Sequence, residues 1–212
     1  MAIVVYVNDV LFFVCDEAEM EKVIQELQTD GFELKREKNG DDTAYSFLGI
    51  ELEQKDGEFK LTQHGLIEKF LKLVNMFECS SAKTPCNAAP LGSNPDGKWH
   101  KEMWEYASAV GMLMCLAGNA HPEIAFAVHQ CARFTHAPRE THSLAVKRIA
   151  KYLKDILDQK QGLIMRPTAQ LFLDCYVDAD FAGLWGYEDD QDPICVQSRT
   201  GYLMTIRTCP VR

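Results

Sequence analysis

The stretch that decides the first part of the fold is IVVYVNDVLFFV, residues 3–14. Two runs of β-branched and aromatic residues, 3–7 and 10–14, flank the polar pair Asn8-Asp9, which suits a tight turn. The stretch therefore predicts an antiparallel β-hairpin with Asn8-Asp9 at its tip. Because that pair interrupts the apolar run and no basic segment precedes it, we expect neither a signal peptide nor a membrane span. The expected location is intracellular, cytoplasmic or nuclear.

A helix and further strands are expected after the hairpin. Asp16 is placed to cap the helix, with Glu19 closing a capping box, and Gly31 to end it. One face of this helix is apolar and is expected to pack against the sheet: Met20, Val23, Ile24 and Leu27. Strand patterns follow at 32–35, 46–53 and 58–61, with polar turns at 38–42 and 55–57. Together these segments predict a small antiparallel α+β unit.

The middle of the chain has the periodicity of helices. A first helix begins at Thr62, and a loop rich in Pro, Gly, Ser and Asn follows from 79 to about 98 as a candidate boundary. Three more helical segments follow: 104–116, one opened by Pro122, and 141–156. The expected buried stripe of the last is Ala145, Ile149, Tyr152, Leu153 and Ile156.

Strand patterns return near the C-terminus, at 163–166, 171–178 and 202–206, with an acidic loop at 188–192. Three strands are too few to bury a core by themselves. We therefore expect the chain to carry only the start of this last unit.

Composition is that of a globular protein, with 47% hydrophobic and 25% charged residues. A net charge of −9 argues against a protein that binds nucleic acid over its whole surface, because phosphate binding depends on Lys and Arg. The eight cysteines form no Cys-x-x-Cys pair and are expected as thiols inside the cell. A zinc cluster of Cys131, His136 and His142 is conceivable, but its spacing matches no usual ligand pattern.

Two acidic turns are candidate metal sites. Asp9, with Asn8 beside it, follows an apolar strand, and a carboxylate at such a rigid edge suits a divalent cation. Asp178 and Asp180 follow a second strand, where side-chain alternation points both to one face. Taken alone, each pattern is more typical of a plain polar turn.

Basic residues gather between 133 and 154, where six Lys and Arg accompany one Glu. Four of them recur along the outer side of the last helix and are candidate phosphate contacts: Lys147, Arg148, Lys151 and Lys154. A solvated helix surface explains the same pattern.

Six blocks, in order, resemble the copia-type reverse transcriptase family over nearly the whole chain. They are Tyr6-Val7-Asn8-Asp9, Phe47-Leu48-Gly49-Ile50, Leu61-Thr62-Gln63, Lys83-Thr84-Pro85, the helical segments 106–117 and 122–128, and Asp178-Ala179-Asp180-Phe181-Ala182-Gly183 with Ser198-Arg199-Thr200-Gly201-Tyr202. The resemblance identifies the chain as a segment of a long-terminal-repeat retrotransposon polyprotein. It implies an α+β fold in three parts: a partial reverse transcriptase palm at 1–61, a helical thumb and connection region at 62–157, and a truncated ribonuclease H-like start at 161–212.

The resemblance implies RNA-directed DNA polymerase chemistry with Mg²⁺ and an RNA/DNA hybrid or primer-template as partner. It assigns Asp9 and the substituted position Asn8 to the polymerase site, and Asp178 to the nuclease site. The family's first hairpin aspartate is Asn8 here, and losing that charge about 4 Å from a divalent ion removes at most about 8 kcal/mol of screened attraction. The chain begins at the hairpin and ends before the remaining nuclease carboxylates, so both sites are expected to be incomplete.

Three hypotheses follow. In the first, the chain is a reverse transcriptase segment that is inactive alone. In the second, it is active when a separate upstream palm region completes it. In the third, it is a non-enzymatic nucleic-acid-binding module that uses the basic helix face. His121 stands where the family has Arg, which removes a phosphate contact otherwise expected there.

Overall fold

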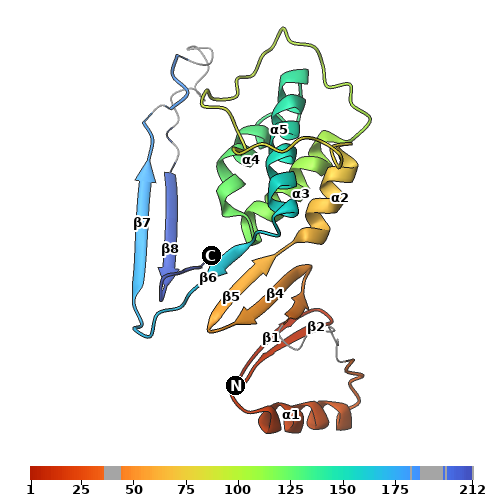
Figure 1. Ribbon diagram of the computed structural model, residues 1–212, viewed down its shortest axis with the longest axis vertical. Coiled ribbons are helices and arrows are strands. Elements are labelled where there is room, and N and C mark those ends of the chain that lie inside the picture. The colour runs from red at the N-terminus through yellow and green to blue at the C-terminus, as the bar shows by residue number, and fades with distance from the viewer. Residues whose placement is uncertain (36–43, 182, 187–197, 199, 212) are drawn as a thin grey trace.

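The computed structural model describes residues 1–35, 44–181, 183–186, 198 and 200–211. These residues form three antiparallel sheets and a bundle of helices, as Figure 1 shows. The bundle of helices lies against one end of a four-stranded sheet, and a two-stranded hairpin lies on the other side of that sheet (Figure 1). A three-stranded sheet lies beside the bundle (Figure 1). The predicted α+β class is therefore confirmed.

The first sheet is the predicted hairpin of β1 (Ala2–Tyr6) and β2 (Asp9–Phe13). Tyr6 pairs with Asp9, so the turn residues are Val7 and Asn8, and the predicted tip of Asn8 and Asp9 was wrong by one residue. The difference arises because Val7 takes the left-handed conformation (φ +51°), which β-branched residues rarely adopt. Asp9 is thus the first residue of β2 rather than a turn residue.

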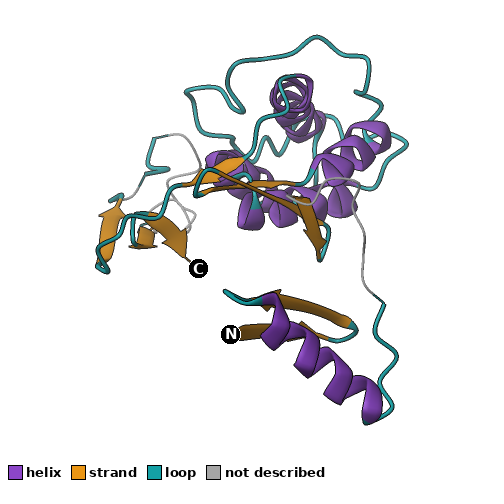
Figure 2. Ribbon diagram, turned by 60° about the horizontal axis from the view of Figure 1, so that its bottom comes forward, coloured by secondary structure: helices purple, strands orange, loops and turns teal. Residues whose placement is uncertain are grey.

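Helix α1 (Glu17–Thr29) follows the hairpin and runs alongside it (Figure 2). The Asp16 carboxylate accepts a 2.9 Å hydrogen bond from the Ala18 N–H, and Gly31 (φ +93°) ends the helix, as predicted. No residue of α1 is fully buried. Its half-buried residues are the four predicted to face the sheet: Met20, Val23, Ile24 and Leu27.

The second sheet has the order β3-β4-β5-β6. Its strands are β3 (Ala44–Phe47), β4 (Ile50–Lys55), β5 (Glu58–Thr62) and β6 (Leu163–Met165). The predicted single strand at 46–53 was wrong, because Leu48 and Gly49 both have positive φ and form a two-residue turn. The predicted turn at 55–57 is confirmed, whereas residues 32–35 are not a strand. The predicted turn at 38–42 lies outside the described residues.

Strand β6 joins this sheet from a distant part of the chain by pairing with β5, Leu163 opposite Leu61. The predicted grouping of 163–166 with the later strands was therefore wrong. Gly162 makes the close approach possible, because a Cβ there would lie 2.4 Å from the Leu61 carbonyl oxygen. The sheet thereby ties the segment before the helical bundle to the segment after it.

The bundle of helices, which Figure 1 shows, contains the main hydrophobic core. Its elements are α2 (His64–Leu73), α3 (Tyr106–Asn119), a 3-10 turn η1 (Pro122–Ile124), α4 (Ala125–Ala132) and α5 (Glu140–Asp158). The predicted helices are confirmed, although Thr62 ends β5 and α2 begins after Gln63. The buried face of α5 is rotated relative to the prediction. Val146 and Ala150 are buried in place of Ala145 and Tyr152, which are half-buried.

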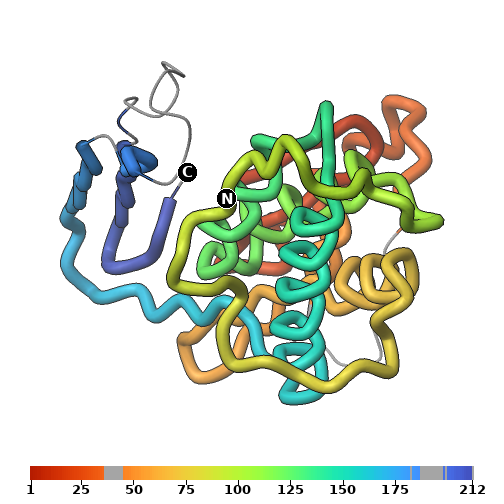
Figure 3. Tube along the Cα trace, turned by 90° about the horizontal axis from the view of Figure 1, so that it is seen from above, coloured from red at the N-terminus to blue at the C-terminus, as the bar shows by residue number. Residues whose placement is uncertain are grey.

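A long irregular segment, residues 79–103, passes around α5 and is here called the strap (Figure 3). Its backbone is held at both ends of its course: Ala82 N–H donates to the Lys151 carbonyl at 3.0 Å, and the Lys98 carbonyl accepts from Glu140 N–H at 2.8 Å. Trp99 also forms an isolated β-bridge with Arg139. The strap is therefore an ordered covering of α5.

The third sheet is β7-β8-β9, formed by β7 (Leu173–Ala179), β8 (Thr200–Ile206) and β9 (Cys209–Val211). The first two strands are confirmed. Strand β9 was not predicted, and its Pro210 is tolerated because β9 is an edge strand of this sheet in the described part of the chain. The predicted acidic loop at 188–192 lies outside the described residues.

Candidate functional site

The hairpin tip carries the residues predicted for the first metal site. Asn8 and Asp9 are both exposed, and the β1–β2 register places Asp9 at the end of β2 next to the turn. The tip thus offers one carboxylate and one amide oxygen to solvent. A two-metal centre needs several carboxylates around each pair of ions.

This donor set does not fit the two Mg²⁺ ions that the resemblance implies. Within the described residues, no three His, Cys, Asp or Glu side chains lie close enough together to hold a metal ion. Asp9 also belongs to the first sheet and Asp178 to the third. The structure therefore does not bring the two predicted carboxylates into one site.

Asp178 lies near the end of β7, opposite Gly201 of β8, and is exposed. Strand β7 ends at Ala179, so the alternation that would align Asp178 with Asp180 stops between them. The Asp180 carboxylate instead lies close to Gly183, where an added Cβ would be 2.2 Å from Oδ2. This site offers an exposed carboxylate at a strand end.

The four predicted phosphate contacts all lie on α5, but three of their side chains have partners within the protein. Lys147 Nζ lies 2.6 Å from Glu102 of the strap, and Lys154 Nζ lies 2.6 Å from Asp158, one turn further along. The hydrogen bond from Lys147 lowers the pKa of the Glu102 carboxyl. These pairs neutralise charges that would otherwise face a phosphate backbone.

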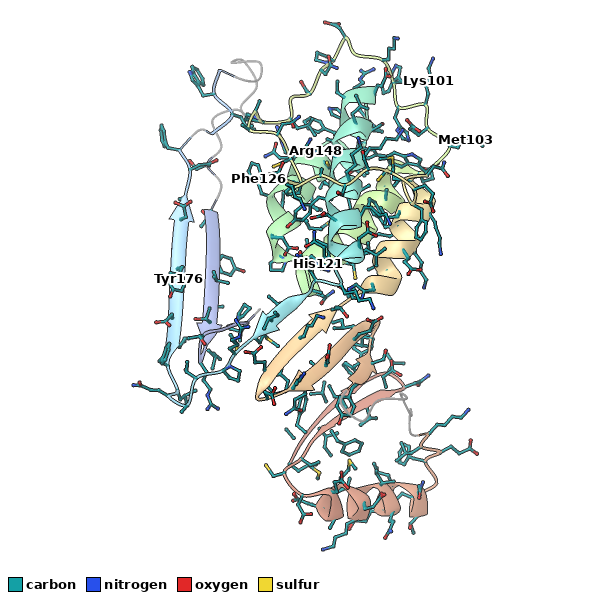
Figure 4. The ribbon with its side chains drawn as sticks, in the orientation of Figure 1. Lys101, Met103, His121, Phe126, Arg148 and Tyr176 are labelled. Atoms are coloured by element: carbon teal, nitrogen blue, oxygen red, sulfur yellow. The ribbon has the colours of Figure 1, made fainter. Side chains whose placement is uncertain are left out.

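Arg148 anchors the strap directly (Figure 4). Its Nε donates to the Thr84 carbonyl at 3.0 Å and its Nη2 to the Thr84 hydroxyl at 2.7 Å. Next to it, Lys83 of the strap donates to both oxygens of Asp155 at 2.9 Å and lowers the pKa of that carboxyl. The side chains of Lys147 and Arg148 on the basic face of α5 therefore hold the strap, and Lys151 contributes its carbonyl.

Sequence reasoning missed an aromatic cluster where the strap meets the start of α5. The Arg139 guanidinium lies 3.5 Å from the centroid of the Trp99 ring, and His142 stacks on Phe134 with centroids 4.0 Å apart. The signal in the sequence is Lys98-Trp99-His100-Lys101, a dense aromatic and basic run inside an otherwise polar loop.

His100 and Ser143 form a buried polar contact beside this cluster. His100 Nε2 donates to the Trp104 carbonyl at 2.9 Å, and its Nδ1 lies 2.6 Å from the Ser143 hydroxyl, which also contacts the Arg139 carbonyl at 3.2 Å. Ser143 is 1% exposed. Since a reactant cannot reach this hydroxyl, we assign the pair to holding the strap on α5.

The zinc alternative does not match the surroundings of His142. Its Nδ1 accepts from Arg139 N–H and its Nε2 donates to the Gly92 carbonyl, both at 2.9 Å. Both ring nitrogens are therefore engaged in holding the strap and capping α5. Burial lowers the pKa of this imidazole.

These features define an α+β protein in which a strapped helical bundle is flanked by antiparallel sheets. The chain is 30% identical over 207 residues, 98% of its length, to the retrovirus-related Pol polyprotein from transposon RE1 of Arabidopsis thaliana. It is 28% identical over 207 residues to the corresponding polyprotein from transposon RE2 of the same plant. A transposon Ty5-1 protein of Saccharomyces cerevisiae is 29% identical over 184 residues, 86% of the chain. No protein-family model and no solved structure matches it.

The chain is thus related, over nearly its whole length, to retrovirus-related Pol polyproteins from copia-type transposons, which confirms the predicted relationship to a retrotransposon polyprotein. It spans only 13% of the length of the RE1 and RE2 polyproteins. Among the described residues, no helix combines the length and apolar character needed to cross a membrane.

Proposed function

We propose that this chain corresponds to the reverse transcriptase region of a copia-type Pol polyprotein and is inactive as a polymerase by itself. The observation that supports the assignment best is the β1–β2 hairpin, which exposes Asn8 in its turn and Asp9 at the start of β2, in the sequence motif that resembles the family's catalytic hairpin. Inactivity is inferred from the charge of the donor set, because Asn8 supplies no carboxylate.

In this proposal the protein's residues bind and position nucleic acid. The two aspartates belong to different parts of the polyprotein. Asp9 belongs to the polymerase part and Asp178 to the start of a ribonuclease H-like part. Bound Mg²⁺ would supply Lewis-acid activation of the primer hydroxyl in a complete polymerase site. The chain's own contribution to that site is the single Asp9 carboxylate.

Primer extension on an RNA template with Mg²⁺ tests the proposal. The full chain is measured alone, and again with the segment that precedes the matched region in the RE1 polyprotein, each with the natural Asn8 and with Asn8→Asp. We expect no extension by the chain alone and the greatest extension with the added segment and Asn8→Asp. Extension by the natural chain alone would contradict the inactivity.

Binding of an RNA/DNA hybrid separates the assignment from the activity. A chain from this region of the polyprotein should bind a primer-template with an affinity that falls as salt rises, because phosphate contacts release counterions. If the chain binds no hybrid and extends no primer with any partner segment, the reverse transcriptase assignment itself is wrong.

A further inference from the structure

Trp99 is a large aromatic residue that the strap holds at the surface. It is 56% exposed, yet its backbone forms a β-bridge with Arg139. The residues on either side are also fixed, since His100 N–H donates to the Pro138 carbonyl at 3.0 Å and the Lys98 carbonyl accepts from Glu140. The ring is therefore presented from an ordered backbone, which reduces the entropy that a ligand contact would cost.

A cation supports the Trp99 ring. The Arg139 guanidinium lies 3.5 Å from the ring centroid, within the range of a cation–π contact. Arg139 is itself held, because its Nη1 donates to the Gly97 carbonyl at 3.2 Å. Since Arg139 is half-buried and Trp99 is more than half exposed, the pair leaves ring surface open for a second flat group.

Lysines flank the ring on the strap. Lys98 and Lys101 are exposed, and in the described part of the chain neither ammonium group has an ion-pair partner. Figure 4 shows Lys101 on the outer course of the strap. The acidic side chains of the same region are Asp96, Glu105 and Glu140, all exposed, and Glu102, which is paired with Lys147.

We propose that Trp99, Arg139, Lys98 and Lys101 form a binding site for single-stranded nucleic acid. An unpaired base stacks on the open surface of the Trp99 ring, and the phosphates next to it contact Lys98 and Lys101. Stacking on an aromatic side chain and backbone contact with cations are together sufficient for such binding, without base-specific hydrogen bonds. A duplex is a poor ligand here, because its bases are already stacked and the nearby acidic residues weaken binding by charge alone.

This site does not depend on the polymerase assignment. It also differs from the basic face of α5, where the strap engages the side chains of Lys147 and Arg148. A failure of primer extension leaves it untouched, and a failure of the experiment below leaves the polymerase assignment untouched.

The test is the affinity of the full chain for a fluorescently labelled oligothymidylate, measured by anisotropy at low salt. Trp99→Ala is expected to weaken binding by about 5-fold to 150-fold, the range for loss of one stacked base. Trp99→Phe should lose less, because it keeps an aromatic face. The matched control is Trp185→Ala, since Trp185 is 55% exposed and lies outside the strap; its affinity should be unchanged.

Lys98→Gln and Lys101→Gln should each weaken binding and reduce its salt dependence. Circular dichroism of every variant checks that the fold is retained. The proposal is overturned if the natural chain binds no oligothymidylate, or if Trp99→Ala and Trp185→Ala behave alike. It is also overturned if Trp99→Ala weakens binding of a duplex of the same length as much as it weakens binding of the single strand, since the ring would then not act by stacking on an unpaired base.

Discussion

Arg148 distinguishes a structural role for the basic face of α5 from a nucleic-acid-binding role. Arg148→Ala removes both hydrogen bonds to Thr84, at 3.0 and 2.7 Å. A hydrogen bond from a charged group contributes about 1.5–3 kcal/mol when buried. Because this contact is partly exposed, we expect the two together to contribute about 1–2 kcal/mol.

For a chain of this length a loss of that size lowers the melting temperature by roughly 2–8 °C. Thermal unfolding followed by circular dichroism measures the change, and limited proteolysis reports whether residues 79–103 become easier to cleave. Arg148→Lys should recover little of the loss, because an ammonium group cannot reproduce the two-pronged contact of the guanidinium.

Lys151→Ala is the matched control, since it removes the same charge from the same helix. Its contact with the strap runs through the backbone carbonyl, which the substitution keeps. The structural role predicts a loss of stability for Arg148→Ala and none for Lys151→Ala. Equal stability of the two variants, with equal losses of hybrid binding, would refute the reasoning and favour the phosphate-contact role predicted from the sequence.

Three further predictions concern the backbone and pH. Val7→Asn should stabilise the hairpin by up to about 1 kcal/mol, because Asn tolerates the positive φ of this turn, and an unchanged denaturant midpoint would contradict it. Gly162→Ala should destabilise the chain by about 1–3 kcal/mol, since its Cβ would meet the Leu61 carbonyl; Gly111→Ala, where a Cβ meets nothing within 4 Å, is the control. Burial lowers the folded-state pKa of His142 below its ordinary 6.5. The unfolded chain therefore binds a proton that the folded chain does not, and stability should fall as pH drops below about 6.5; a His142→Gln variant should lose this component of the pH dependence in denaturant titrations.

Periodicity in the sequence was sufficient to predict the elements that bury a single face, and in α1 to predict which face that is. The spacing of Met20, Val23, Ile24 and Leu27 predicted the half-buried side of α1, and Asp16 and Gly31 marked its ends. Such signals are local, because capping and a one-sided apolar pattern depend on residues within one or two turns. The ancestry was likewise predicted from the order of short blocks, and the relatives confirm it.

Three errors came from turns and strand partners. Val7 and Leu48 adopt positive φ although neither residue favours it, so the sequence pattern misplaced the hairpin tip and overlooked a turn inside 46–53. The partner of β6 could not be predicted either, because the whole helical bundle lies between β5 and β6 in the sequence, although the two strands pair in space. Pairing of distant strands depends on three-dimensional closure, which local patterns do not contain.

The hairpin around Asn8-Asp9 was determined by the sequence alone, since two apolar β-branched runs on either side of a polar pair have few other ways to pair their backbone groups. The same is true of the relationship to retrotransposon polyproteins and of the uncharged side chain at Asn8. Only the tertiary structure decided what the cations of α5 do, because Glu102 and Thr84 lie 45 and 64 residues away from Lys147 and Arg148. It also decided that Trp99 lies on Arg139, since that contact exists only after the strap has closed around the helix.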